Sequence, residues 1–494
     1  MSVSKWISLL LNCLMLTWGR AFADEPLKVG LAETDITPPV GFPMAGYFHE
    51  RLAEGQMDPL KAKCIVFRTE QQQAALVVCD LIAASADFAI EVKRRASEKT
   101  GIPAANIIVS ATHSHTAPDY TKSMYTFLRT PAGATNVNET TKLRSHYIAS
   151  LVENAVVTIV RAHHEAKPAR LESGWVEQQT PVAFNRRFVQ KDGSVKTWVG
   201  LENPDSVRSA GPVDPEIGLL LVRDESGLPT GLVSNFALHL DTVGGQKWSA
   251  DYPYFMEQSI RKALGEQVIS IFGTGCCGDI NHVNPRGKDR NKTDFIGNSL
   301  GETITGGLRH LSRLEDMHLE VRTGIVQLPL QESTKDDVEK AVIIMKAAKA
   351  GESVEFLDHV TAHKRLLIDQ IRNKPRFAST DDARLALLMT SSWEGIGATL
   401  PAEVNVITLG KDLAIVALPG EVFVELGLAI KRGSPFRTTL VVELSNAVET
   451  CYVPTRAAFA GGSYEVTNST LQPGAGEMLV EEALKQLRSA ASRN

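Results

Sequence analysis

Short apolar runs alternate with longer stretches of helical spacing along most of the chain. Runs typical of strands lie at 62–68, 75–80 and 106–111 and in the segments GLVSNFALH, QVISIFGTG, LAIVALPG and TTLVVELSN. Helical spacing covers 84–101, 252–265 and most of 335–395. The alternation predicts an α/β fold with a mixed β-sheet core and flanking helices, in which 335–395 forms a helical layer or an insertion.

Two histidines stand at the point where the apolar run 106–111 ends, in the segment ATHSHTAP. His113 and His115 are two positions apart, so on a strand both imidazoles would point to the same face. This arrangement suits a metal site or a catalytic site, and the carboxyl end of a strand is where open α/β sheets bind their ligands. An ordinary half-buried strand end has the same pattern, so the pair alone does not decide between these interpretations.

Further candidate ligands follow other predicted strands. His239 ends the run GLVSNFALH, Glu421 follows a strand and a Pro-Gly turn, and Tyr452 lies in ETCYVPT. Each also has a structural explanation, such as a carboxylate favoured at a helix N-terminus by the helix dipole. We expect the histidines and Glu421 to meet at one sheet edge, at the carboxyl ends of the strands. Two or three nitrogen ligands, one carboxylate and an open position make up a hydrolytic zinc site.

The glycine-rich loop GTGCCGDINHVNPRG follows a predicted strand and is a further candidate part of the site. It lacks the Lys-Ser/Thr of a phosphate-binding Walker A loop and the G-x-S-x-G pattern of a serine-hydrolase elbow. Asp279, Asn281 and His282 are the polar side chains that could line a site there. His282 fits a solvated loop position equally well.

The composition limits the classes of partner. The 494 residues carry a net charge of −5 and no basic run, so we expect no nucleic-acid or polyanion partner.

The N-terminus is typical of an export signal, with Lys5, an apolar stretch from Trp6 to Trp18 and a small-x-small cleavage site. These features predict a signal peptide over 1–23, with an uncleaved N-terminal anchor as the alternative. The protein would then be periplasmic or secreted, with 24–494 as a single domain. The pattern predicts no particular oligomeric state.

Several motifs together resemble the neutral/alkaline, non-lysosomal ceramidase family, from about Val29 to Tyr464. They are AETDITPPVGFPMAGY, VSATHSHTAP, FNR at 184–186, DPEIGLLLVRD, NFALH, GCCGD, LPGE and YVPT. Each motif alone is weak, but THSH followed by NFALH and PGE in this order is more specific. The resemblance implies an amide hydrolase with a single zinc ion.

The resemblance also implies roles for individual residues. In the family a zinc ion lies among two histidines, a glutamate and a tyrosine, which by motif correspond to His113, His239, Glu421 and Tyr452. His115 would lie beside the zinc-bound water as a candidate proton shuttle. Tyr464 would be a second tyrosine near the site, and Arg186 would lie near the substrate headgroup.

Two features depart from the family pattern. Where the family reads G-D-x-S-P, this chain has Gly278-Asp279-Ile280-Asn281, so Asn281 stands in place of a serine that is important for activity. A serine acyl-enzyme route is therefore not expected, whereas attack by zinc-bound water is. Ceramidases proper also carry a C-terminal immunoglobulin-like domain, and this sequence ends about 30 residues after Tyr464. We expect a short member of the family, and ceramide as the substrate stays open.

These observations predict an exported zinc-dependent amidase that cleaves an N-acyl linkage in a small-molecule or lipid-like amide. Peripheral contact with membrane lipid is left open. A first alternative keeps the site and changes the bond to an ester, a lactone or a carbohydrate-derived amide. A second alternative is an inactive binding protein of the same fold, which only Asn281 favours.

Overall fold

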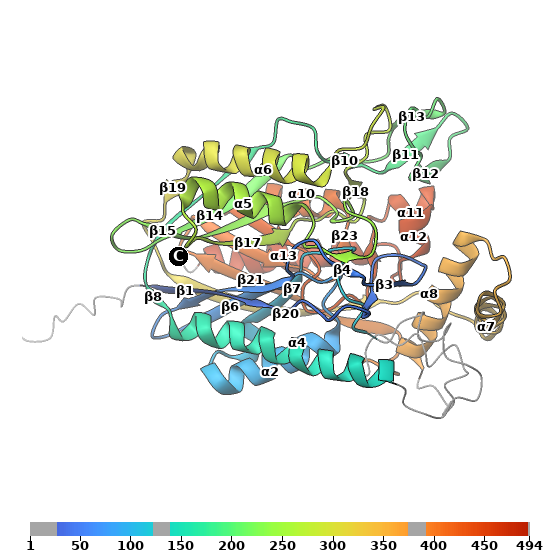
Figure 1. The fold of residues 1–494 in the computed structure, drawn as a ribbon, viewed down its shortest axis with the longest axis horizontal. Helices are drawn as coiled ribbons and strands as arrows, with labels where there is room; N and C mark the ends of the chain where they lie inside the picture. Colours follow the sequence, from blue (N-terminus) through green and yellow to red (C-terminus); the bar gives the residue numbers. More distant parts are fainter. Residues whose placement is uncertain (1–26, 122–138, 374–391, 493–494) are drawn as a thin grey trace, which may run out of the picture.

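The computed structural model describes residues 27–121, 139–373 and 392–492, so the predicted signal peptide, 1–23, lies outside the described part of the chain. Within these ranges the predicted α/β class is confirmed, because strands form several sheets and helices lie on their outer faces (Figure 1). Three sheets of five, five and four strands hold most of the β structure. In the same ranges we find no helical segment with the length and hydrophobicity of a membrane span.

The first sheet has the strand order β7-β6-β5-β1-β8, and α2 and α4 pack against it. The strands predicted at 62–68 and 75–80 are present as β5 and β6, an antiparallel hairpin in which Cys64 pairs with Val77. Ser85 caps α2 by accepting a hydrogen bond from the Phe88 N–H, and the helix stops at Gly101, whose φ of 77° favours glycine. The elements are β1 (Lys28–Asp35), β5 (Lys61–Arg68), β6 (Gln73–Cys79), β7 (Ile107–Ala111), β8 (Lys167–Pro168), α2 (Ala86–Thr100) and α4 (Glu139–His164).

The second sheet has the order β17-β15-β14-β9-β19, and α5 and α6 pack side by side above it (Figure 1). Gly297 lets these two helices approach closely, because a Cβ there would lie 2.4 Å from the Tyr252 carbonyl oxygen. Strands β15 and β17 run parallel, so they end side by side. The elements are β9 (Arg170–Glu177), β14 (Glu216–Arg223), β15 (Pro229–Phe236), β17 (Ile269–Thr274), β19 (Ser312–Arg313), α5 (Tyr252–Leu264) and α6 (Thr293–Gly307).

The third sheet has the order β20-β21-β22-β24 and is covered by α10 and α13. Helix α13 buries Leu479, Ala483 and Leu487, a stripe at four-residue spacing that is typical of a helix lying on a sheet. Strands β22 and β24 run parallel and also end together. The elements are β20 (Leu319–Pro329), β21 (Thr399–Leu409), β22 (Leu413–Ala417), β24 (Thr438–Val442), α10 (Val424–Gly433) and α13 (Ala475–Ala491).

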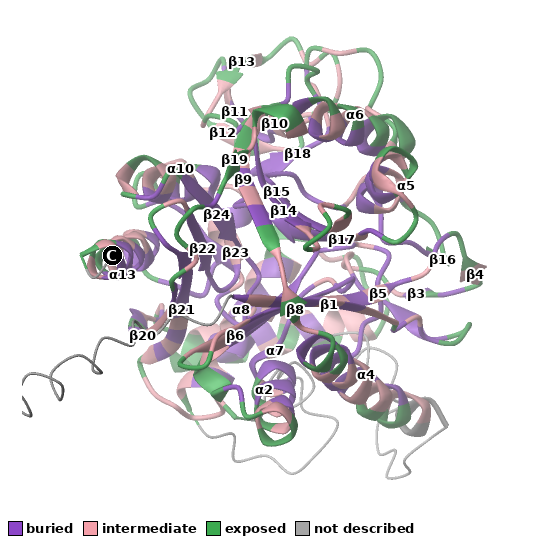
Figure 2. Cartoon of the chain, turned by 90° about the vertical axis from the view of Figure 1, so that its left-hand side faces the viewer, coloured by how far each residue is buried: buried purple, intermediate pink, exposed green. Residues whose placement is uncertain are grey.

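The three sheets enclose one shared apolar core. It contains Ile65 and Leu76 from the first sheet, Val233 from the second, and Ile415 and Leu440 from the third, all buried. Figure 2 shows the three sheets around this buried centre, with helices outside each of them. The expectation that the candidate ligands share one sheet edge is therefore wrong, because the strands that precede them belong to different sheets. Strand order depends on long-range pairing, which the hydrophobic pattern does not record.

Two smaller units lie at one end of the molecule, on the right of Figure 1. One is the helix pair α7 (Lys335–Lys349) and α8 (Phe356–Arg372), and the other is the three-stranded sheet β12-β11-β13. Residues 374–391 of the predicted helical layer lie outside the described ranges. The strands of the small sheet and the remaining short strands and α-helices are β11 (Arg187–Gln190), β12 (Val195–Thr197), β13 (Ser206–Ser209), β2 (Pro43–Met44), β3 (Arg51–Leu52), β4 (Gly55–Gln56), β10 (Phe184–Asn185), β16 (Lys247–Trp248), β18 (Ile280–Asn281), β23 (Glu421–Val422), β25 (Tyr452–Val453), α11 (Ala458–Gly461) and α12 (Tyr464–Thr467).

Candidate metal centre and cleft

The candidate ligands lie just beyond strands from three different sheets. His113 follows β7, His239 follows β15, and Glu421 begins β23 shortly after β22. Hydrogen bonds tie the strand ends of different sheets together. For example, the Thr274 hydroxyl at the end of β17 donates to the Thr112 carbonyl, which follows β7, at 2.8 Å. The fold thereby gathers side chains that are far apart in the sequence.

Hydrogen bonds to backbone carbonyls fix the orientation of the two buried histidines. His113 has a left-handed backbone conformation, with a φ of 76° that is unusual for a residue other than glycine, and its Nδ1 lies 2.7 Å from the Ile82 carbonyl oxygen. His239 Nδ1 lies 2.8 Å from the Cys277 carbonyl oxygen. Since a carbonyl oxygen only accepts, each Nδ1 donates, and each Nε2 is the atom left to bind a metal.

The Nε2 atoms of His113 and His239 and the Oε2 atom of Glu421 form a nearly equilateral triangle. The two nitrogens are 3.1 Å apart, and each lies 3.3 Å from Glu421 Oε2. Ligands placed tetrahedrally at ~2.0 Å from a zinc ion are ~3.3 Å from one another. Glu421 Oε2 is buried and makes no hydrogen bond to any described residue. The spacing and the nitrogen and oxygen donors therefore fit a zinc ion.

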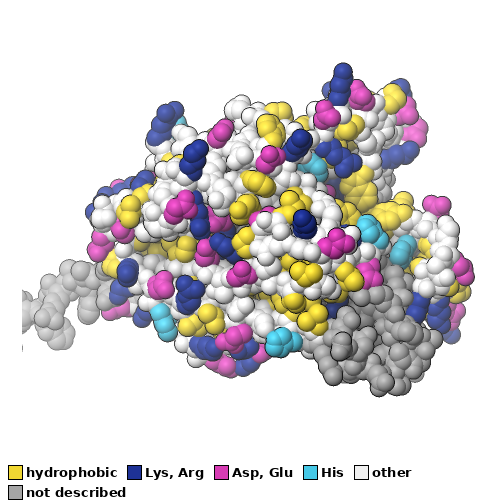
Figure 3. Space-filling view, viewed as in Figure 1, with side chains coloured by type: hydrophobic (Ala, Val, Ile, Leu, Met, Phe, Trp, Pro, Cys, Tyr) yellow, Lys and Arg dark blue, Asp and Glu magenta, His cyan; other side chains and the backbone are white. Residues whose placement is uncertain are grey.

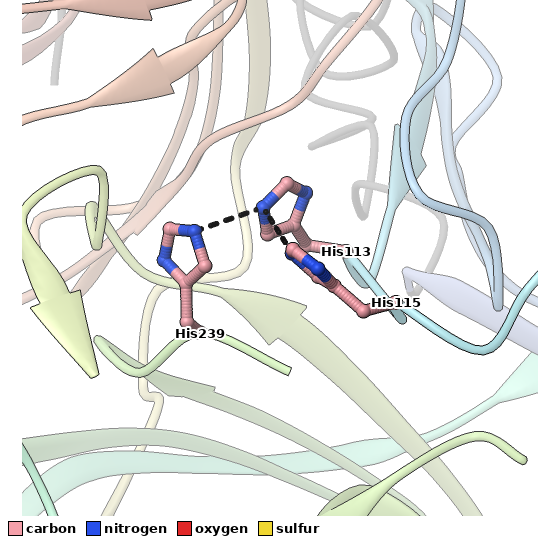
Figure 4. Close-up of side chains that lie close together, drawn as sticks. All are labelled: His113, His115 and His239. Carbon is pink, nitrogen blue, oxygen red and sulfur yellow. Dashed lines mark hydrogen bonds between the residues drawn. The ribbon is translucent and has the colours of Figure 1, made fainter. Parts of the chain in front are cut away.

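His115 lies next to the same cluster, as Figure 4 shows. Its Nε2 is 3.4 Å from that of His113, and the ring nitrogens of His113, His115 and His239 lie within 4.8 Å of one another. These three histidines could hold a metal ion. His115 is half-buried and lines the cleft described below, whereas the other two rings are buried. This position is compatible with a fourth ligand and with a group that acts beside the metal.

Burial and mutual proximity set the charges of the cluster. Burial alone would raise the pKa of Glu421, but His113 and His239 hold it well below its ordinary value, so the carboxylate is ionised. Burial lowers the pKa of His239, and burial together with the charge of His113 lowers the pKa of His115 to about 3. Burial alone would lower the pKa of His113 as well, but the Glu421 carboxylate raises it, which favours a proton on the ring. A metal ion bound here would displace that proton.

Tyr452 lies beside Glu421, because β25 pairs in parallel with β23 and places the two residues opposite each other. Its hydroxyl accepts a hydrogen bond from Arg186 Nη2 at 3.0 Å, and Arg186 Nε donates to Glu465 Oε1 at 2.7 Å. Burial and the charge of Glu421 raise the pKa of Tyr452, which keeps the phenol protonated. Arg186 thus positions Tyr452, and the fully buried Glu465, which no sequence motif included, positions Arg186.

Asn281 and Tyr464 complete the set of predicted site residues. Asn281 is buried, and its Oδ1 accepts a hydrogen bond from the Val283 N–H at 3.1 Å. This leaves Asn281 Nδ2 as a donor, and it has no hydrogen-bond partner among the described residues. The ring of Tyr464 packs against that of Tyr452, with centroids 5.5 Å apart. The structure therefore brings the predicted residues together, and their individual roles stay predictions.

A cleft with a volume of about 490 Å³ opens beside His115. The polar side chains in its lining include Asp241, Asn281, His282 and Arg290. The aromatic side chains in its lining include Phe48, Trp198, Phe356, Tyr452 and Tyr464. Sequence reasoning missed Phe48, Trp198 and Phe356, because they come from three distant segments and carry no recognisable site pattern. The cleft has the size and the mixed lining of a small-molecule site.

A family model described as "Neutral/alkaline non-lysosomal ceramidase, N-terminal" matches residues 27–288, which is more than half of the chain. The chain belongs to this family. The resemblance seen in the sequence motifs is thus confirmed. The neutral ceramidase of Pseudomonas aeruginosa is 26% identical over 249 residues, which cover 48% of this chain and 34% of that relative. The matched segment of the chain therefore spans about a third of the length of this curated ceramidase.

Solved ceramidase structures share the fold over nearly the whole chain. The crystal structure of neutral ceramidase from Pseudomonas aeruginosa has a TM-score of 0.66 and 18% sequence identity, and the match covers 95% of this chain and 75% of that one. A ceramidase complexed with C2 has a TM-score of 0.67 and 17% identity, and the match covers 95% of this chain and 76% of that one. At these identities the likeness establishes the fold alone.

Proposed function

We propose that the protein is a zinc-dependent amidase that hydrolyses an N-acyl linkage in a small-molecule or lipid-like substrate. The observation that carries the proposal is the triangle of His113 Nε2, His239 Nε2 and Glu421 Oε2 beside a cleft. Membership of the ceramidase family supports an amide as the substrate, since ceramide, from which the family takes its name, is an N-acyl amide.

The ligand set is His113, His239, Glu421 and Tyr452, as the family motifs imply. A zinc ion bound there would supply Lewis-acid polarisation and a nucleophile at neutral pH. His115 lines the cleft with its Nε2 3.4 Å from that of His113, so a neutral imidazole there can accept a proton and pass it to the leaving nitrogen. In the complete reaction, one water molecule is consumed, and the amide is split into a carboxylate and an amine.

Two groups, one of them the ligand Tyr452, stabilise the charge that develops on the scissile carbonyl oxygen. Asn281 Nδ2 is a donor without a partner among the described residues, and the Tyr452 hydroxyl is a second donor held by Arg186. Donors that are fixed before the reaction stabilise an oxyanion without reorganising. Asparagine has no hydroxyl to acylate, so this arrangement supports hydrolysis without an acyl-enzyme intermediate.

The test combines metal analysis with activity. The full chain should contain about one zinc ion per molecule, lose its hydrolysis of short N-acyl amides when a chelator removes the ion, and regain it with added zinc. A matched series of amides, esters and lactones with the same acyl group identifies the bond that is cleaved. A chain that hydrolyses none of these substrates with its zinc bound would contradict the proposal.

We also propose that the protein is exported and that residues 1–23 are removed. The charged start, the apolar stretch and the small-x-small site of the sequence support this. N-terminal analysis of the protein recovered outside the cytoplasm should find Asp24 as the first residue. An intact Met1 on the extracytoplasmic protein would favour the uncleaved anchor instead.

A further inference from the structure

A buried carboxyl lies close to the metal centre but does not line the cleft. Glu443 directly follows β24, and its side chain is fully buried. Among the described residues, no Lys, Arg or His forms an ion pair with it. On the face that Figure 3 shows, by contrast, acidic side chains lie among basic ones at the surface. A carboxyl in the interior is costly unless its hydrogen bonds are made, so the bonds of Glu443 indicate its role.

One oxygen of this carboxyl is bonded to the segment that carries Glu421. Glu443 Oε2 accepts a hydrogen bond from the Val422 N–H at 2.6 Å. Val422 is the next residue after Glu421 and belongs to the same short strand, β23. In addition, the Leu444 N–H donates to the Gly420 carbonyl at 3.1 Å. The residues on both sides of Glu421 are therefore held by Glu443 and the residue after it.

The other oxygen is bonded to the residue that orients His239. Glu443 Oε1 accepts a hydrogen bond from the Cys277 thiol, whose Sγ lies 3.0 Å away. The Cys277 carbonyl in turn accepts a hydrogen bond from His239 Nδ1 at 2.8 Å, which leaves Nε2 as the atom that faces the proposed metal position. The carboxyl of Glu443 thus joins two of the proposed ligands, His239 and Glu421, through one residue on each side.

The backbone of Glu443 is itself fixed to two neighbouring strands. Its N–H donates to the Thr274 carbonyl, at the end of β17, at 2.9 Å. Its carbonyl accepts a hydrogen bond from the Ser110 hydroxyl at 3.0 Å, and Ser110 lies in β7, three positions before His113. A residue anchored on both sides has little freedom to move, so its two side-chain bonds fix the segments that they reach.

The bridge spans two ligands whose spacing is critical for a zinc ion. His239 Nε2 and Glu421 Oε2 are 3.3 Å apart, which suits two ligands of one tetrahedral zinc ion. Since Glu421 Oε2 makes no hydrogen bond to any described residue, its position depends on the backbone that carries it. We propose that Glu443 is a positioning residue, whose carboxyl holds His239 and Glu421 at the spacing that zinc requires. The inference rests on the proposed zinc site and adds a residue outside the ligand set.

The test measures zinc affinity and metal geometry in the full chain, so it does not depend on a substrate. Glu443→Leu removes both acceptors, and its zinc dissociation constant in a chelator competition should rise about 10- to 100-fold, the range for losing a group that orients a ligand. Glu443→Gln keeps an acceptor for the Val422 N–H and offers a donor to the Cys277 sulfur, so it should bind zinc as the wild type does. The visible spectrum of the cobalt-substituted protein depends on ligand geometry and should change in Glu443→Leu only.

A buried carboxylate elsewhere provides the matched control. Glu257 on α5 is 4% exposed and forms ion pairs with Lys63 and Arg261. Glu257→Leu should lower the melting temperature of the metal-free protein and leave the zinc affinity and the cobalt spectrum unchanged. This control separates the loss of a buried acid from the loss of the bridge.

The thiol side of the bridge gives a second test if Glu443→Leu does not fold, as judged by its thermal melt. Cys277→Ala removes the donor, so its zinc dissociation constant should rise about 2- to 10-fold, the range for one hydrogen bond. Cys277→Ser keeps a donor and should bind zinc as the wild type does. An unchanged zinc affinity in Cys277→Ala would then overturn the inference.

The remaining outcomes separate this inference from the proposed function. Wild-type zinc affinity and an unchanged cobalt spectrum in Glu443→Leu overturn the inference and leave the zinc site standing. A Glu443→Gln variant that binds zinc as weakly as Glu443→Leu also overturns it, because the loss would then not follow the hydrogen bonds. A wild type that binds no zinc overturns both the inference and the proposed function.

Discussion

Replacing Asn281 by alanine tests the proposed role of this side chain as an oxyanion donor. The side chain is 3% exposed, and its Oδ1 is held by the Val283 N–H at 3.1 Å. Nδ2 is therefore a fixed donor beside the cleft, and in the proposed mechanism its removal takes away one hydrogen bond to the developing oxyanion. We expect Asn281→Ala to lower kcat by about 10²–10³-fold, which is about 2.7–4 kcal/mol of transition-state stabilisation.

An isosteric variant separates the donor from the shape of the side chain. In Asn281→Asp one carboxylate oxygen can keep the bond from Val283, while the other replaces the Nδ2 donor with a negative acceptor. We expect this variant to lose at least as much kcat as Asn281→Ala. Single-turnover kinetics with an N-acyl amide, measured together with the zinc content of each variant, provide the assay.

Two results would refute this reasoning. A kcat of Asn281→Ala close to the wild-type value, at full zinc content, would show that Asn281 contributes no donor. An inert wild type that gains amidase activity in Asn281→Ser would show that the family serine is required and that hydrolysis without an acyl-enzyme is wrong.

Three further predictions concern neighbouring features. His115→Ala should keep its zinc and lose about 10²–10⁴-fold in turnover, whereas loss of zinc would make His115 a ligand. Gly278→Ala would place a Cβ 2.5 Å from the Glu421 carbonyl oxygen, so its zinc affinity in a chelator competition should fall about 10- to 100-fold. Gly306→Ala, where a Cβ meets nothing within 4 Å, should bind zinc as the wild type does. Burial raises the pKa of Glu449 from 4.5 to about 7, so its contribution to stability is full below about pH 4.5 and is lost as the pH rises through 7. In urea unfolding, the unfolding free energy of the wild type should therefore fall between about pH 5 and about pH 8 by about 2.5 kcal/mol more than that of Glu449→Gln.

The hydrophobic pattern was a good guide to local structure. The strands predicted at 62–68 and 106–111 are present as β5 and β7 within one residue of those bounds, and the helix predicted at 84–101 is α2. Such elements have strong periodicity and clear end signals, for example Ser85 before α2 and Gly101 after it. Short-range patterns of this kind depend on neighbouring residues only, so a single sequence reveals them.

The arrangement of these elements could not be predicted in the same way. The pattern suggested one sheet, but His113, His239 and Glu421 follow strands of three sheets that meet around a shared core. The family motifs named the candidate ligands, yet they did not include Glu465, which holds Arg186. Side chains whose role depends on contacts between distant segments carry no periodic signal, and only the fold shows them.

The most direct test of the central claim is a crystal structure of the zinc-loaded protein with anomalous scattering data collected at the zinc absorption edge. We predict a single strong anomalous peak at ~2.0–2.2 Å from His113 Nε2, His239 Nε2 and Glu421 Oε2, with His115 beside it. A crystal of active protein with no peak among these three atoms, or with a peak bound by other side chains, would contradict the account.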